Sequence, residues 1–201
     1  MNGNWVMDKD QSTGLEEVLK LQGIGWITRK ALLAAAVTLK ITQDADVTQQ
    51  STKPVKCITL EQIVSGGFGG GPEKRLLTWS KMKHDDRLFG RVAIQSHYTP
   101  GLRNSGGGVQ PVFAAATTGI DANIESFLKE PVFIDGYTEV AEKNMEEVFL
   151  HDFIRSEDAG WTAEQIWAVE SVGGDTLLTR RVVVAKGRAT ETARVLYRRR
   201  N

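Results

Sequence analysis

Hydrophobic and polar residues alternate along much of this chain, which is the period of β-strands with one buried face. The alternation is clearest over residues 37–43 and 87–98. Gly173-Gly174 and Gly187 fall where short hairpin turns between antiparallel strands are expected. Residues 73–82 fit a strand or a helix, and their context favours a strand. After a first strand around Gly3, the pattern predicts strands over residues 37–43, 55–64, 73–82, 87–98, 149–155, 164–170, 176–186 and 190–199.

The region after the first strand changes to a helical period. Leu15, Val18, Leu19 and Gln22 share one helical face, and Gly23 stands where a left-handed C-cap is expected. Thr13 and Glu16 have the spacing of a capping box. A second helix is predicted over residues 24–36. Because neither helix is long enough to be stable alone in water, each must lie on an apolar surface. Residues 13–36 therefore form either a lid over a sheet or an ordinary helical hairpin packed against one, and the order of the elements favours the lid.

From Thr99 to about Pro131 the strand pattern breaks. Glycines, prolines and an alanine tract dominate the first part, and Ile124, Phe127 and Leu128 fit one short helix. A second helix is predicted over residues 138–148. Long segments of this kind inside a compact domain are uncommon and often serve as functional lids. We treat residues 99–148 as an insertion between two strands.

The chain has 201 residues, of which 41% are hydrophobic, so it is long enough to bury one core as a single domain over residues 1–201. About nine or ten antiparallel strands without βαβ alternation indicate a mainly β fold. The expected architecture is a closed up-and-down β-barrel with an N-terminal helix-turn-helix lid. A barrel of this size can enclose one small ligand.

The N-terminal order of elements carries a resemblance to a known family. A strand with Gly3-Asn4-Trp5, followed by two short helices joined through glycine, resembles the opening of fatty-acid-binding proteins and, more loosely, of lipocalins, both calycin barrels. Residues 2–44 and 160–197 also resemble small, uncharacterised fungal lipocalin-like proteins. The resemblance implies a cavity for a hydrophobic or amphipathic molecule, with Trp5 as a structural plug of the barrel.

The strand over residues 87–98 has two different faces. One face carries Leu88, Val92, Ile94 and Tyr98, and would line a largely apolar cavity. The other carries Phe89, Arg91 and His97, which would be buried polar groups in need of partners if this face pointed inward. Exposure of the second face is the favoured interpretation.

Arginines near the C-terminus are candidate ligand anchors. Many fatty-acid-binding proteins hold a carboxylate with an arginine and a tyrosine two residues apart on the last strand. Here Arg194 and Tyr197 are three apart and so point to opposite faces. Arg180 and Arg181 must likewise diverge, and a buried one would suit a carboxylate, an enolate or a phenolate. The alternative is a salt bridge to residues 121–170, which hold thirteen Asp and Glu against three Lys and Arg.

Aromatic and cationic residues on the predicted strands and lid complete the candidate binding set. His97, Arg91 and Tyr98 are also the candidate catalytic residues. The expected ligand-binding residues are Trp26, Trp79, Phe89, Arg91, His97, Tyr98, Trp167, Arg180, Arg194 and Tyr197.

Other functional classes have little support in the sequence. His84, His97 and His151 are scattered, so neither a metal nor a cofactor is expected. The arginines at residues 198–200 lack interleaved aromatic residues, which argues against nucleic acid as a partner. Cys57 is alone and is expected to be a buried strand residue, in keeping with the cytoplasm. Neither a signal peptide nor a membrane span is expected. The oligomeric state stays open.

Two functions remain open at this point. The first is binding of an amphipathic small molecule anchored by arginine. The second is a cofactor-independent cyclase or isomerase of the Diels–Alder type, which would act on a polyketide- or terpene-like substrate in natural-product biosynthesis. A closed apolar cavity could promote such a reaction by holding a flexible substrate in a reactive conformation. The enlarged segment over residues 99–131 favours the enzyme, since a plain carrier needs no extra lid.

Overall fold

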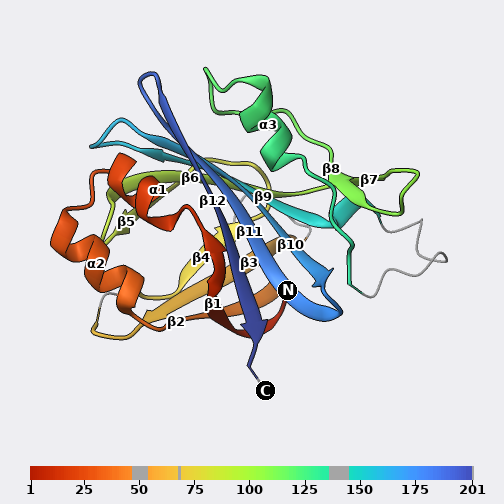
Figure 1. Ribbon diagram of the computed structural model, residues 1–201, viewed down its shortest axis with the longest axis horizontal. Coiled ribbons are helices and arrows are strands. Elements are labelled where there is room, and N and C mark those ends of the chain that lie inside the picture. The colour runs from red at the N-terminus through yellow and green to blue at the C-terminus, as the bar shows by residue number, and fades with distance from the viewer. Residues whose placement is uncertain (47–53, 68, 136–144, 201) are drawn as a thin grey trace.

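Ten antiparallel strands form one sheet that curls into a nearly closed barrel (Figure 1). The computed structural model describes residues 1–46, 54–67, 69–135 and 145–200. The predicted mainly β, up-and-down architecture with an N-terminal helix pair is confirmed. The barrel strands are β1 (Gly3–Thr13), β2 (Val37–Asp46), β3 (Val55–Val64), β4 (Glu73–Leu76), β5 (Met82–Asp86), β6 (Gly90–Thr99), β9 (Phe149–Ser156), β10 (Thr162–Val172), β11 (Asp175–Lys186) and β12 (Ala189–Arg199).

The two ends of the curled sheet are β4 and β5, which meet without pairing as neighbouring strands. The single strand predicted over residues 73–82 is therefore wrong. Trp79, between the two strands, has a left-handed backbone (φ 61°), and its amide donates to the carbonyl of Ser96 on β6. This seam is bridged by the amide of Leu76, 3.2 Å from the sulfur of Met82, and by His84 Nε2, 3.5 Å from Glu73 Oε2.

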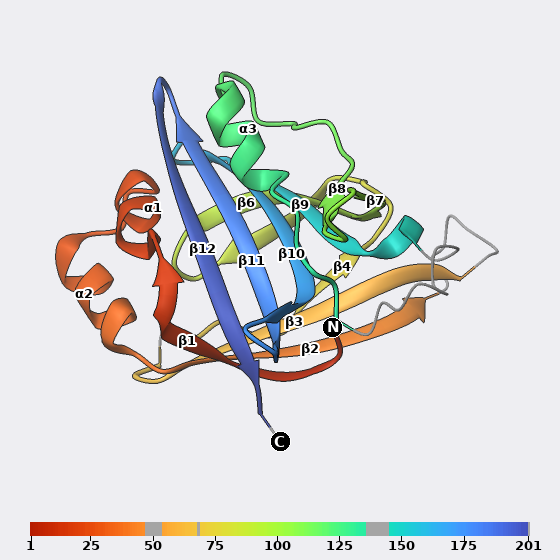
Figure 2. The same ribbon diagram turned by 45° about the vertical axis from the view of Figure 1, so that its right-hand side comes forward.

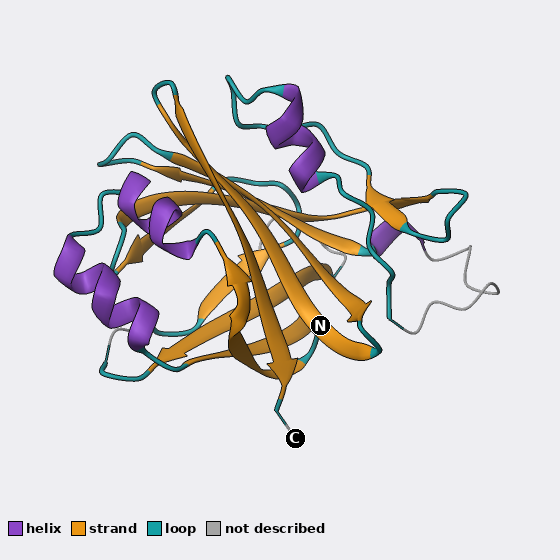
Figure 3. Ribbon diagram, viewed as in Figure 1, coloured by secondary structure: helices purple, strands orange, loops and turns teal. Residues whose placement is uncertain are grey.

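Helices α1 (Leu15–Leu21) and α2 (Trp26–Ala34) lie together beside one end of the barrel, as Figure 3 shows. Gly23 has φ 90° after α1, which confirms the predicted left-handed C-cap. The capping box is wrong, because the N-cap of α1 is Gly14 and no side chain caps the helix. A Cβ at Gly14 would lie 2.0 Å from the carbonyl oxygen of Thr192, so glycine permits close contact with β12.

The described part of the segment between β6 and β9 covers the outside of the barrel rather than its lid end (Figure 2). It contains β7 (Gly101–Arg103), β8 (Val109–Pro111) and α3 (Ala122–Leu128), the last of which confirms the short predicted helix. Most of the helix predicted over residues 138–148 lies outside the described residues. Leu128 of α3 is fully buried in a cluster with Ile166 of β10 and Val183 of β11.

The barrel wall therefore has two hydrophobic layers where this segment covers it. Alternate residues of β10 and β11 point inward, toward the core that contains Trp167 and Val182, or outward, toward the cluster around Leu128. Cys57 on β3 is a buried free thiol, as expected. Within the described residues, none of the helices is long and apolar enough to cross a bilayer.

Candidate functional site

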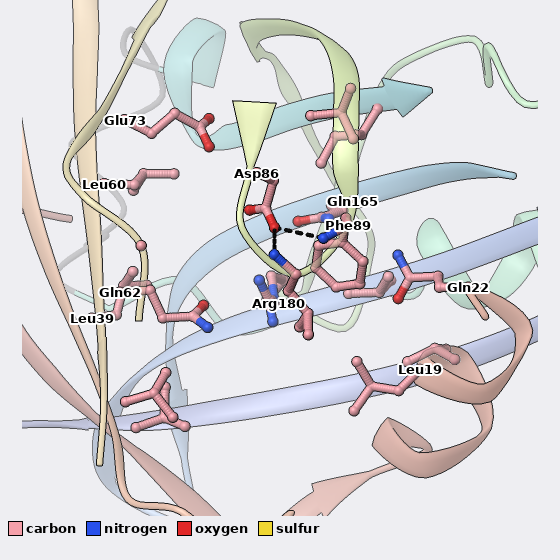
Figure 4. Close-up of a pocket in the computed structure, with 18 of the residues that line it drawn as sticks. Leu19, Gln22, Leu39, Leu60, Gln62, Glu73, Asp86, Phe89, Gln165 and Arg180 are labelled. Atoms are coloured by element: carbon pink, nitrogen blue, oxygen red, sulfur yellow. Dashed lines mark hydrogen bonds between the residues drawn. The ribbon is translucent and has the colours of Figure 1, made fainter. Parts of the chain in front are cut away.

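A cavity of about 240 Å³ lies inside the barrel beneath the N-terminal helices. Leu19 of α1 and Gln22, the C-cap of that helix, extend toward it, as Figure 4 shows. Val18, which is almost fully buried, also lines it from the same helix. The predicted amphipathic face of α1 is therefore the face that covers the cavity, because its apolar side chains can leave water only on the barrel.

The inward face of β6 is the apolar one. Val92 and Ile94 line the cavity, whereas Arg91 points away from it. The Arg91 side chain is 67% exposed and lies 2.6 Å from Asp158. The favoured interpretation, exposure of the other face, holds for Arg91 but not for His97, which Trp79 and His151 cover. Phe89 lines the cavity because it belongs to the turn before β6, where the strand alternation has not begun.

Arg180 of β11 points into the cavity between two aromatic rings. Its guanidinium carbon lies 4.8 Å from the ring centre of Trp167 and 6.0 Å from that of Tyr197. The Arg180 Nε is buried without a hydrogen-bond partner, and among the described residues no carboxylate forms an ion pair with this side chain. Burial raises the pKa of the neighbouring Tyr197 phenol, which stays neutral and cannot serve as the counter-ion.

Arg75 of β4 also lines the cavity, but the positive charge of its guanidinium is neutralised by two carboxylates. Its Nη1 donates to Asp152 at 2.6 Å, and its Nε donates to Glu73. Burial alone would lower the pKa of Arg75, but the carboxylates of Asp152 and Glu73 outweigh it and raise that pKa. Asp152 also accepts hydrogen bonds from Ser96 and from the indole N–H of Trp167.

The structure brings only part of the predicted binding set to the cavity. Of the ten predicted residues, those that line the cavity are Phe89, Trp167, Arg180 and Tyr197. The other predicted residues lie outside its lining: Trp26, Trp79, Arg91, His97, Tyr98 and Arg194.

The residues outside the lining have identifiable positions. Trp26 lies on α2, a helix without a buried residue, and its side chain is 64% exposed. Arg194 points out of the barrel to Glu170, at 3.1 Å, while Tyr197 points in. The expected absence of an arginine–tyrosine clamp follows, since the two side chains lie on opposite faces of β12. Tyr98 accepts a hydrogen bond from Gln43 Nε2, and Trp79 and His97 lie on the outside of the wall.

Several cavity residues were absent from the predicted set. Alternation along β10 from Trp167 identifies Gln165, which also lines the cavity. Alternation could not identify Arg75, because the strand predicted over residues 73–82 had the wrong extent. Arg181 follows the predicted divergence from Arg180: it points outward and lies 3.5 Å from Glu130 of the acidic segment. Among the described residues, no three His, Cys, Asp or Glu side chains are arranged to hold a metal ion.

The topology and the cavity define a barrel of the fatty-acid-binding-protein type. The chain is similar in structure to human cRBP IV, with a TM-score of 0.54, 12% identity and coverage of 100% of this chain and 98% of that one. It is similar to the fluorescent protein UnaG with a TM-score of 0.54, 12% identity and coverage of 100% and 97%. A REP1-NXSQ fatty acid transporter matches with a TM-score of 0.52, 10% identity and coverage of 100% and 96%.

At these identities the likeness establishes the fold alone. No protein-family model matches the chain, and no curated protein matches its sequence. The predicted resemblance to small fungal proteins finds no support in these comparisons.

Proposed function

We propose that the barrel binds an amphipathic small molecule whose acidic group lies at Arg180 and whose apolar part fills the cavity. The observation that carries this proposal is the contrast between Arg75 and Arg180, since the third arginine of the cavity lining, Arg87, is exposed and donates to a backbone carbonyl. Arg75 has two carboxylate partners, Glu73 and Asp152, whereas Arg180 has none among the described residues. A guanidinium that is partly removed from water without a counter-ion favours an anion as its partner.

The surroundings of Arg180 favour a carboxylate over a neutral ligand. Trp167 and Tyr197 stabilise the cation through their ring faces, an effect of about 0.5–2 kcal/mol per contact. Neither ring supplies a hydrogen-bond acceptor to the buried Nε of Arg180. A ligand carboxylate would satisfy this donor and form a charge-assisted hydrogen bond, which is roughly twice as strong as a neutral one.

The rest of the cavity suits an apolar chain or ring. Aliphatic and aromatic side chains from the wall and the lid make up much of its surface, and they include Leu19, Leu39, Leu60, Val92 and Ile94. One structural neighbour is described as a fatty acid transporter, which supports the ligand class proposed here. The expected cytoplasmic location stays a prediction, because another protein of this fold, As-p18, is described as extracellular.

The cyclase or isomerase alternative loses the observation that favoured it. That hypothesis treated residues 99–131 as an additional lid, but none of these residues lines the cavity. Two of its catalytic candidates, Arg91 and His97, lie on the outer face of β6, and Tyr98 is not part of the cavity lining. Binding is the function that the geometry supports.

The proposal can be tested by measuring the affinities of dodecanoate and dodecan-1-ol for the wild-type protein and an Arg180→Met variant. We expect Arg180→Met to weaken dodecanoate binding roughly tenfold or more, which is the loss of one charge-assisted hydrogen bond, and to leave the alcohol nearly unaffected. Arg91→Met, which removes an exposed arginine, is the matched control. Equal affinity of dodecanoate for the wild type and Arg180→Met would refute the anchor, and no binding of either probe would refute the cavity.

A further inference from the structure

Three polar side chains form a hydrogen-bonded row across the outer face of β10, β9 and β6. Glu164 Oε1 lies 2.7 Å from His151 Nε2, and His151 Nδ1 lies 3.0 Å from His97 Nε2. His151 and Glu164 are fully buried, while His97 is partly exposed. The rings of Trp79 and Phe113 cover His151, at centroid distances of 4.7 and 4.6 Å. The row thus runs from the buried wall to the surface.

Glu164 lies at the buried end of the row, where its carboxylate accepts hydrogen bonds. Besides His151, the backbone amides of Ala116 and Thr117 donate to its two oxygens, at 2.9 and 2.7 Å. Burial raises the pKa of Glu164, but these hydrogen bonds outweigh burial and lower that pKa. The group is therefore a carboxylate at neutral pH and can only accept hydrogen bonds.

The carboxylate fixes the direction of the first hydrogen bond in the row, because Glu164 can only accept and His151 therefore donates to it from Nε2. In a row where each histidine carries a single ring proton, His97 donates from Nε2 to His151 Nδ1, and its own Nδ1 is an acceptor with a free lone pair. Among the described residues, no group forms a hydrogen bond with His97 Nδ1, and this atom is not fully buried. That lone pair is therefore accessible from the surface.

A cleft of about 390 Å³ opens beside His97 at the seam side of the barrel. Trp79 and Tyr98 provide aromatic walls, and Trp79 is held in its left-handed conformation by hydrogen bonds to Ser96 and Gln95. The cation in the cleft, Lys56, is neutralised by Glu147. Within the described residues, the remaining carboxylate, Glu146, has no ion-pair partner. The described lining is Lys56, Leu77, Thr78, Trp79, His97, Tyr98, Glu146 and Glu147.

We propose that this cleft is a second binding site, separate from the barrel cavity, for an organic amine with an aromatic or apolar body. Its ammonium donates to His97 Nδ1 and is attracted by the unpaired carboxylate of Glu146. Its apolar body lies against Trp79 and Tyr98, whose ring faces also favour a cation. A carboxylate ligand is disfavoured, because it would meet a lone pair on His97 and a carboxylate on Glu146.

The site is tested by titrating the full-length protein at pH 7.5 with 2-phenylethylamine and with 3-phenylpropanoate, an anion of similar length. We expect the amine to shift the indole resonance of Trp79 and the ring resonances of His97, and the anion to bind at least tenfold more weakly there. His97→Phe keeps an aromatic ring beside Trp79 but removes the acceptor, so it should weaken amine binding roughly tenfold or more. Arg91→Gln, an exposed change on the same strand, should bind the amine as the wild type does.

A second measurement keeps the test decisive if His97→Phe fails to fold. Imidazole nitrogen chemical shifts of the wild-type protein at pH 7.5 should show His97 and His151 both protonated at Nε2 and not at Nδ1. A proton on His97 Nδ1 would overturn the proposal, as would tighter binding of 3-phenylpropanoate at the cleft or full amine affinity in a folded His97→Phe. None of these results depends on Arg180, so this proposal and that for the barrel cavity can fail independently.

Discussion

The two faces of the wall formed by β6, β9 and β10 handle buried charge in opposite ways. On the inner face, Asp152 neutralises Arg75, but Arg180 is left without a carboxylate among the described residues. On the outer face, Glu164 receives every hydrogen bond it needs from His151 and from the covering segment. Residues 151 and 152 are adjacent in sequence and serve the two sides separately, because strand side chains alternate.

The difference lies in the partners that each face supplies for its charged groups. Glu164, beneath the covering segment, is fully hydrogen-bonded by the chain itself. Arg181 on the same side has Glu130 as an ion-pair partner, although its Nε is buried without an acceptor. In the cavity, Arg180 has no carboxylate partner among the described residues and lies beside empty volume, which is why we propose that an amphipathic ligand binds there. Only at its exposed end, His97, does the outer row leave an atom available.

The largest effect is expected at the inner ion pair. Asp152→Ala removes the partner of a buried arginine and leaves Arg75 with Glu73 alone, so the free energy of unfolding should fall by about 3–5 kcal/mol. Urea denaturation measures this change. Asp158→Ala, which breaks the exposed pair with Arg91, is the control and should change stability little. Similar losses of stability in both variants would mean that burial does not make the Arg75–Asp152 ion pair more stabilising than the exposed Arg91–Asp158 pair.

A second pair of substitutions compares the packed outer cluster with the lined cavity. Leu128→Ala creates a void in the cluster between α3 and the wall, where the leucine is fully buried, and should cost about 2–5 kcal/mol. Leu60→Ala only enlarges a cavity that already exists, so it should cost less. Denaturation midpoints of both variants decide the order. A larger loss for Leu60→Ala would show that the cavity wall is the tighter of the two layers.

The smallest effect concerns pH. Burial, and then the nearby His151, lowers the pKa of His97 below its ordinary value of about 6.5, with Asp152 opposing. Since the unfolded chain takes up the proton first, stability is complete above about pH 6.5 and declines as the pH falls through the folded-state pKa. Thermal melts between pH 8 and pH 5 measure the decline. His97→Gln, which does not titrate, should make it shallower, and an unchanged slope would contradict this assignment.

The fold could be predicted because its signals are local. Strand alternation, glycine turns and the helical face of α1 each act over a few residues, and β3 was placed with its observed bounds. The divergence of Arg180 from Arg181 and of Arg194 from Tyr197 also follows from the strand period alone. The seam at Trp79 could not be foreseen, because its left-handed backbone is held by a hydrogen bond to Ser96 on another strand.

The binding set was harder to predict than the fold. Which face of a strand points inward depends on what covers the other face, and no local pattern showed that the described residues between β6 and β9 pack against β9–β11. His97 was assigned to a solvated face because His151 and Glu164 meet it only through strand pairing. Arg75 was missed because its pairing with Asp152, 77 positions away, cannot be read from sequence spacing.

The meeting of β4 and β5 has a mechanical consequence. The circumference of the barrel is interrupted at a line where a thioether contact and a histidine–glutamate pair replace the backbone ladder. Widening along this line would separate side chains while every strand keeps its paired neighbour on the other side. The barrel can therefore widen along this line without breaking a backbone hydrogen bond between two paired strands.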